Sequence, residues 1–278
     1  MLKQRVITAL VLLAILLPAL FYPTPVPFAL VALLLIAAGG WEWARLNAYG
    51  SLSAWGAGFA CVLLCGMSWD LGLLEKPLPF LWRVAGAAWV LVGAWLLRGG
   101  VAGWPRIPRF IRLAGGVLAL WLAWLAVAQA RFTGIEFLLS VLLLVWVADI
   151  GAYFAGKSFG GRFSKGKLAP AISPGKSWEG VWGGMAGVLV LCVVWLALDS
   201  TGQSLYARLA AQHGIALTLL FMIFLATFSV VGDLVESLIK RSAGAKDSSG
   251  LLPGHGGVLD RVDALLPVLP LVMMLLTV

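Results

Sequence analysis

Charge is scarce in this chain. Only 12% of its 278 residues are Asp, Glu, Lys or Arg, whereas 62% are hydrophobic and the mean hydropathy is +0.99. A soluble domain is normally about half apolar, so this composition excludes a soluble globular protein and makes the lipid bilayer the solvent for most of the chain. The sequence therefore predicts an all-α polytopic integral membrane protein.

Cysteine is scarce as well. Cys61, Cys65 and Cys192 all fall inside apolar segments, and none has a His or a second Cys at metal-binding spacing. We therefore interpret them as small core residues. The basic N-terminus precedes an apolar run but is followed by no small-x-small cleavage site, which favours a first anchor helix over a removed secretory signal.

What the chain has instead is long stretches nearly free of charge. About nine transmembrane helices are expected, because nine such segments approach the ~20 residues that a helix needs to cross about 30 Å of hydrocarbon. Two of them, 28–41 and 84–97, are short, which indicates either a re-entrant segment or a helix that extends into its flanks. The nine segments are residues 6–21, 28–41, 53–69, 84–97, 113–130, 135–153, 180–198, 215–238 and 264–278.

The basic residues predict the orientation, because loops rich in Lys and Arg stay in the cytoplasm. With a cytoplasmic N-terminus, 16 of the 20 Lys and Arg residues fall inside, and those outside are Lys76, Arg83, Arg131 and Arg208. The net charge of +8 is then a topology signal and an attraction for anionic headgroups and phosphates. Because these charges lie in short loops between helices, we expect no nucleic-acid partner.

One dense polar run interrupts the apolar pattern after the segment 215–238. Its charges lie beside a Gly-rich turn, and this composition is typical of a site for phosphates and a metal ion. The fixed positions of the run are Ser237, Lys240, Arg241, Lys246, Asp247, Pro253, His255, Gly256, Gly257, Asp260, Arg261 and Asp263. Across its whole length, this spacing resembles the C-terminal motif of the phosphatidate cytidylyltransferase (CDP-diacylglycerol synthase) family.

A second polar segment follows the helix expected at 135–153. Its run Ser173-Pro-Gly-Lys176-Ser177-Trp-Glu179-Gly is similar to a Ser-Pro-x-Lys-Ser/Thr-x-Glu-Gly motif of the same family. Glycines here let backbone N–H groups approach phosphate oxygens, and positive charge for a triphosphate comes from Lys165, Lys167 and Lys176. A Walker P-loop is excluded, because Pro170 stands where its first Gly is required.

The resemblance implies an enzyme that transfers the cytidylyl group of CTP to phosphatidic acid, giving CDP-diacylglycerol and pyrophosphate for phospholipid biosynthesis. It also implies a homodimer among membrane lipids, in a bacterial cytoplasmic (inner) membrane, with the active site on the cytoplasmic side. We expect residues 1–130 to form an N-terminal transmembrane scaffold. Residues 131–278 are expected to form the catalytic transmembrane region, with cytoplasmic loops at 154–179 and 239–263.

Each candidate residue is assigned a role that suits its chemistry. Carboxylates are suitable ligands for Mg²⁺ and for a possible second cation. Metal binding is therefore assigned to Asp149, Asp233, Asp247, Asp260 and Asp263. Catalytic charge stabilisation is assigned to Lys240, Arg241, Lys246, His255 and Arg261. Nucleotide contacts are assigned to Ser237, Ser248, Ser249, Gly256, Gly257, Lys167, Ser173, Lys176 and Ser177. For His255 we favour phosphate contact over acid–base work, because the attacking phosphate is already anionic near neutral pH.

Several of these acids also suit a purely structural role. Asp149 can snorkel to the interface, and the loop acids can simply neutralise their basic neighbours. Glu179 suits a helix N-terminus as well as a catalytic role. Asp233 and Glu236 either extend the metal site or line a pore.

Two rival functions compete with the transferase. An anion carrier or channel is disfavoured, because the polar residues crowd one face instead of spanning the bilayer. A CTP-using lipid or polyprenol kinase shares the nucleotide and metal, but its hydroxyl acceptor requires a general base and makes His255 central.

Overall fold

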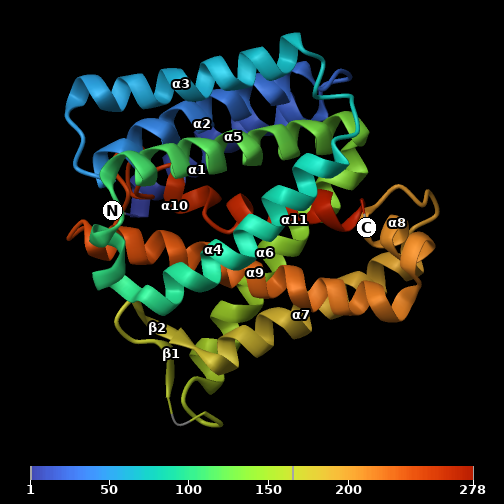
Figure 1. Cartoon of the computed structure of the whole chain (residues 1–278). Helices are drawn as coiled ribbons and strands as arrows, with labels where there is room; N and C mark the ends of the chain where they lie inside the picture. Colours follow the sequence, from blue (N-terminus) through green and yellow to red (C-terminus); the bar gives the residue numbers. More distant parts are fainter. Residues whose placement is uncertain (1, 165, 278) are drawn as a thin grey trace.

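The computed structural model describes residues 2–164 and 166–277, and Figure 1 shows an all-helical bundle with one small hairpin in that part of the chain. The helices are α1 Leu2–Phe21, α2 Val26–Leu46, α3 Ser51–Asp70, α4 Pro79–Gly103, η1 Trp104–Arg106, α5 Arg109–Thr133, α6 Ile135–Phe159, α7 Trp178–Leu198, α8 Leu205–His213, α9 Ile215–Ser242, α10 Leu259–Val262 and α11 Leu265–Leu275. The hairpin pairs β1 Lys167–Ala169 antiparallel to β2 Ser173–Ser177. Lys165 lies outside the described residues.

The predicted membrane architecture is confirmed. Within the described ranges, eight helices are long and apolar enough to cross a membrane, namely α1 to α7 and α9. Both short predicted segments extend into their flanks, because α2 and α4 continue past the apolar runs to 21 and 25 residues. The last predicted span, 264–278, differs: its helix α11 has 11 residues, and ~1.5 Å of rise per residue leaves it too short to cross.

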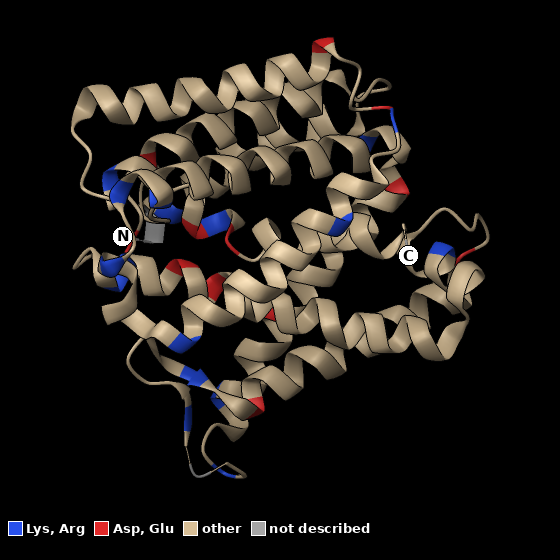
Figure 2. Ribbon diagram, viewed as in Figure 1, with Lys and Arg blue, Asp and Glu red and all other residues tan. Residues whose placement is uncertain are grey.

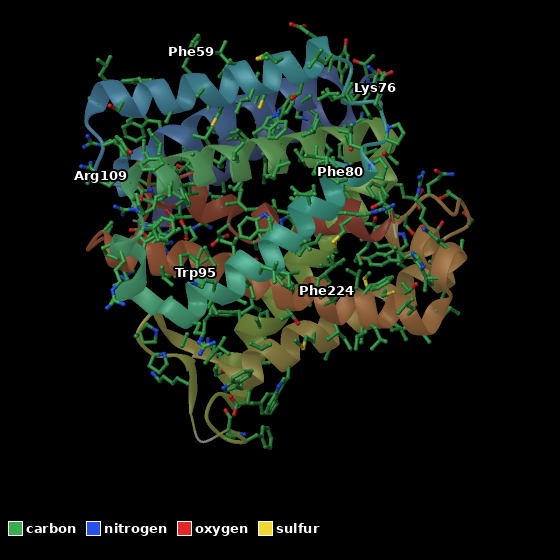
Figure 3. The ribbon with its side chains drawn as sticks, in the orientation of Figure 1. Phe59, Lys76, Phe80, Trp95, Arg109 and Phe224 are labelled. Atoms are coloured by element: carbon green, nitrogen blue, oxygen red, sulfur yellow. The ribbon has the colours of Figure 1, made fainter. Side chains whose placement is uncertain are left out.

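The helices form two groups that meet at α11 (Figure 1). Helices α2, α3 and α5 pack together in one group, while α6, α7 and α9 pack in the other, and α11 contacts α4, α5 and α9. Large apolar side chains point outward from this bundle; Figure 3 shows Phe59 on α3 and Phe80 on α4, which are 62% and 79% exposed. Such exposure is expected where lipid, and not water, is the solvent.

The two ends of the bundle differ in charge. Figure 2 shows Lys and Arg concentrated at the end that carries the N-terminus, and Figure 3 places Arg109 and Lys76 at opposite ends. At the sparsely charged end, Arg131 donates to the carbonyls of Leu20 (3.0 Å) and Tyr22 (2.6 Å), and Arg83 donates to that of Thr277 (3.0 Å). Loops rich in Lys and Arg stay in the cytoplasm, so this distribution of basic residues is the one expected for a protein whose N-terminus is cytoplasmic.

Helices α6 and α7 approach each other so closely that their backbones touch. A Cβ on Gly184 would lie 2.7 Å from the Ala148 carbonyl oxygen, and one on Gly151 would lie 2.8 Å from that of Gly183. Small residues allow this kind of packing in membranes, where burial from water does not drive helices together. The contact fixes the position of α6, which carries Asp149, relative to the hairpin that leads into α7.

Replacing Gly184 by Val is therefore expected to destabilise the protein, because the added side chain meets backbone that cannot move aside. We expect a loss of about 1–3 kcal/mol in the free energy of unfolding, measured by denaturation in detergent. Gly66→Val is the matched control, since a Cβ at Gly66 meets nothing within 4 Å. Equal stability of the two variants would contradict a role for this close approach.

Candidate active site

The polar residues gather at the N-terminal end of the bundle. The loop 243–258 and α10 lie beside α2, and α9 contacts both α10 and the strand β2 of the hairpin. Figure 2 shows acidic positions on α6, α9 and α10 close to one another in this region. Segments that are far apart in the sequence therefore share one charged site.

Lys240 and Asp260 form its most connected pair. Lys240 Nζ lies 2.5 Å from Asp260 Oδ1 and also pairs with Glu236, one turn earlier on α9. The other oxygen of Asp260 accepts hydrogen bonds from Ser248 N (2.8 Å), Ser248 Oγ (2.8 Å) and Gly257 N (2.7 Å). Burial opposes ionisation of Asp260, but the bonds from Lys240, Gly257 and Ser248 outweigh it and lower the pKa of this carboxyl group. Asp260 is therefore an anion with both oxygens engaged.

Asp263 belongs to a group of acidic side chains next to this pair. Its Oδ1 accepts the Ala264 N–H (2.8 Å), and burial, followed by the charge of Asp233, raises the pKa of Asp263 to about 7; Asp149 adds to this shift. Lys176 Nζ, on β2, lies 2.6 Å from Asp233 Oδ2, which brings the hairpin to α9. Ser237, predicted to contact the nucleotide, donates to Asp233 Oδ1 (3.2 Å).

The chemistry of this group fits a divalent cation. Asp149, Asp233, Glu236 and Asp263 interact with one another, and the cations that neutralise them are Lys176 and Lys240. Clustered carboxylates with an excess of negative charge are the ligands that Mg²⁺ prefers. In the described part of the chain, however, no three acidic, His or Cys side chains already converge closely enough to hold a metal ion.

A helix that begins near Leu259 lets Asp260 and Asp263, three residues apart, share one face and converge on one cation or a close pair. In this structure Asp260 is held by Lys240 and the loop, whereas Asp263 interacts with Asp233 and Asp149 as well as with Lys240 and Glu236. Asp247 is exposed and lines a pocket on the far side of the Gly256 turn. The hydrogen bonds from Ser248 and Gly257 hold the Asp260 carboxylate against the loop. These bonds are the physical reason why Asp260 has different neighbours from Asp263.

That pocket brings together several of the predicted phosphate contacts. It has a volume of about 660 Å³ and lies at the end of α1. Its lining residues are Arg5, Lys246, Asp247, Ser249, Gly250, Leu252, Gly254, His255, Gly256 and Arg261. Three of the residues with predicted catalytic roles, Lys246, His255 and Arg261, therefore face one cavity.

The remaining predicted residues lie outside this pocket. Lys167 is exposed on β1, opposite Ser177 on β2, and Ser173 lies at the start of β2. Ser177 Oγ accepts the Gly180 N–H (3.2 Å) as the N-cap of α7. Arg241 donates to the carbonyl oxygens of Ile172 (3.4 Å) and Ala245 (3.3 Å), so it ties the loop to the hairpin.

Glu179 holds the loop between α6 and α7. It is buried at the start of α7, and its Oε1 accepts Phe163 N (3.0 Å), Ser164 N (2.8 Å) and Ser164 Oγ (2.8 Å). These bonds hold the turn that ends α6 against the first turn of α7. Glu179 is thus a structural anchor for the loop between the two helices.

Sequence reasoning missed Glu42, on α2. This carboxylate is fully buried and accepts hydrogen bonds from Ser249 Oγ (2.5 Å), Val258 N (2.9 Å) and Leu259 N (2.8 Å). Its Oε2 also lies 3.2 Å from Ser248 Oγ, which donates its one proton to Asp260. It occupies the space where Gly257 would carry a side chain, so only glycine fits there. The available signal was an acid at the end of an apolar run, where ionisable residues are costly and rare.

These features define an integral membrane protein with a charged site built from both ends of its chain. A family model described as "Cytidylyltransferase family" matches residues 3–278. A phosphatidate cytidylyltransferase from Pseudomonas aeruginosa is 43% identical over 279 residues, which cover 97% of this chain and 95% of the relative. One from Haemophilus influenzae is 38% identical over 296 residues, with 97% and 96% covered. The chain therefore belongs to the cytidylyltransferase family, which confirms the resemblance seen in its two polar motifs.

Replacing Glu42 by Ala is expected to destabilise the protein by at least about 3 kcal/mol, because buried donors of the loop lose their shared acceptor. Glu42→Gln keeps the volume and one acceptor oxygen, so we expect an intermediate loss. Thermal unfolding in detergent, together with proteolysis of the loop 243–258, measures both effects. Glu75→Gln, at an exposed acid, is the control. A Glu42→Ala variant as stable as this control would show that the carboxylate does not hold the loop.

Proposed function

We propose that this chain transfers the cytidylyl group of CTP to phosphatidic acid, giving CDP-diacylglycerol and pyrophosphate for phospholipid biosynthesis. The observation that carries the proposal is the match to the cytidylyltransferase family over residues 3–278. The two relatives are matched over nearly their whole length, so the complete enzyme is the appropriate comparison. The basic pocket next to an acidic group supplies the two kinds of charge that the reaction needs.

In this reaction, an oxygen of the lipid phosphate attacks the α-phosphorus of CTP in line. The new P–O bond forms as the bond to the β-phosphate breaks, and the electron pair leaves with pyrophosphate. Lys246, His255 and Arg261, which share the pocket, bind phosphate oxygens and offset the charge of the leaving group. No general base is required, because the attacking phosphate is already ionised.

The acidic group is the proposed magnesium site. Asp263 and Asp233, with Asp149 nearby, would hold Mg²⁺ and a possible second cation. Bound there, Mg²⁺ supplies charge neutralisation that brings two anionic phosphates together. Lys176, paired with Asp233, positions the hairpin over this group, and Asp260 acts through Lys240 and the loop.

The membrane architecture suits a lipid substrate. The acyl chains of phosphatidic acid can stay in hydrocarbon while the headgroup reaches a site at the end of the helices, which CTP enters from water. The site lies at the end rich in Lys and Arg, which supports a cytoplasmic location in a bacterial inner membrane. We also propose a homodimer, surrounded by membrane lipids and without nucleic acid.

The rival functions predict different products. Transport makes no covalent product, and a lipid kinase releases CDP instead of pyrophosphate. Membership of the cytidylyltransferase family favours nucleotidyl transfer over both alternatives.

The test is to incubate the purified protein in detergent with CTP and phosphatidic acid and to measure CDP-lipid and pyrophosphate. We expect product with Mg²⁺ and none after chelation. Asp263→Asn keeps the shape of the side chain but weakens metal binding, so kcat should fall by at least about 100-fold. Asp70→Asn, at an exposed acid that ends α3, is the control and should retain full activity. Full activity of Asp263→Asn, or product formation under chelation, would contradict the proposed metal site.

A further inference from the structure

We infer that the pocket between α1 and residues 246–257 holds the β- and γ-phosphates of the nucleotide, the pair that leaves as pyrophosphate, and that Arg5 on α1 is one of its anion-binding residues. This inference rests on the proposed function and deepens it. Arg5 belongs to neither of the polar motifs, and it lies more than 200 residues before the loop that it faces.

The first helix is built against this loop. Thr8 Oγ1 donates to the Pro253 carbonyl oxygen (2.9 Å), which fixes α1 beside the turn. A Cβ on Gly254 would lie 2.8 Å from Arg5 Cγ and 3.3 Å from Arg5 N, and Gly254 has a φ of +78°. The stem of Arg5 therefore packs on the glycine turn, and Arg5 is one of the residues that line the pocket.

The pocket carries excess positive charge. Arg5, Lys246 and Arg261 line it together with one carboxylate, that of Asp247. Among the described residues, the ion pairs are made by Lys176 and Lys240, so none of these three cations is neutralised by a direct pair. An anion with several charges is the ligand that this lining favours.

His255 supplies a second, independent indication of a ligand. Its Nδ1 is buried and has no hydrogen-bond partner within the described chain. A buried nitrogen without a partner is unfavourable, and a phosphate oxygen satisfies it when Nδ1 carries the proton. His255 lies in the same wall as Lys246 and Arg261.

The position of the pocket distinguishes the nucleotide from the lipid. Its one large apolar lining residue is Leu252, and it opens at the end of α1, so it offers no surface for acyl chains. A single glycine turn separates it from Asp260, because a Cβ on Gly256 would lie 2.6 Å from Asp260 Oδ2 and 3.3 Å from Asp247 Cβ. Asp260 is joined through Lys240 to Glu236, which belongs to the acidic group. The α-phosphate can thus stand beside the acidic group while the β- and γ-phosphates extend into the pocket.

This placement gives Arg5 a role in the chemical step. When the bond between the α-phosphorus and the bridging oxygen breaks, the electron pair goes to pyrophosphate, whose negative charge increases. Arg5, Lys246 and Arg261 stabilise that charge where it develops. Pyrophosphate then leaves toward water through the pocket, away from the lipid.

The test uses the full-length protein in detergent and inorganic pyrophosphate as the probe. Direct binding is measured by calorimetry or by the shift in melting temperature, and the inhibition constant is measured in the forward reaction. In Arg5→Gln we expect pyrophosphate to bind about tenfold or more weakly, because a charge-assisted contact is lost, while the KM for phosphatidic acid stays unchanged. Arg5→Lys, which keeps the charge and the stem, should recover part of the affinity.

The matched control is Arg106→Gln, an exposed arginine of η1 outside the pocket, which should bind pyrophosphate like the wild type. Unchanged pyrophosphate binding in Arg5→Gln would overturn the inference, and so would a selective rise in the KM for phosphatidic acid. If Arg5→Gln does not fold, Arg5→Met decides, because it keeps an apolar stem against Gly254 and removes the charge; wild-type affinity for pyrophosphate there would also overturn the inference. A wild-type protein that binds pyrophosphate but makes no CDP-lipid would instead contradict the proposed function alone.

Discussion

The site depends on one buried carboxylate. Glu42 accepts hydrogen bonds from Ser249 at the start of the glycine-rich loop and from Val258 and Leu259 at its end. Both ends of the loop therefore meet at a single side chain, which holds the intervening residues as a closed turn. A buried carboxylate is tolerated because all these donors face it, and a buried polar group that is hydrogen-bonded avoids most of the cost of leaving water.

A second carboxylate completes the arrangement from the other side. Asp260 binds Ser248 and Gly257 of the same loop and joins them to Lys240 on α9. The loop is thus held between α2 and α9 by two anions, and Ser248 contacts both. In a region of low dielectric constant such contacts are strong but leave little tolerance for change, because any donor without its acceptor is costly. This explains why polar contacts, in an otherwise apolar protein, determine the shape of the site.

Sequence alone predicted the parts of this architecture that depend on local pattern. Apolar length gave the spans, because a bilayer leaves few alternatives to helices, although the helix ends of α2 and α4 extend beyond the apolar runs. Four residues of the motif, Lys240, Ser248, Gly257 and Asp260, contact one another in the structure. What the motif spacing could not supply were partners from distant segments: Glu42 precedes Ser248 by 206 residues, and nothing local connects them. For the same reason, helical spacing could not show that Asp260 is hydrogen-bonded to the loop while Asp263 interacts with acids on α6 and α9.

The long separation between Glu42 and its partners also affects how the protein is made. At about 5–20 residues per second, a ribosome needs roughly 10–40 s to synthesise the 206 residues between Glu42 and Ser248. Throughout that interval α2 contains an acid whose acceptor oxygens lack their final donors. The nascent chain therefore has to keep Glu42 near water at the end of the span until the last part of the chain arrives. Burial of that carboxylate is thus coupled to assembly of the loop 243–258 and the start of α10, which bring its hydrogen-bond donors.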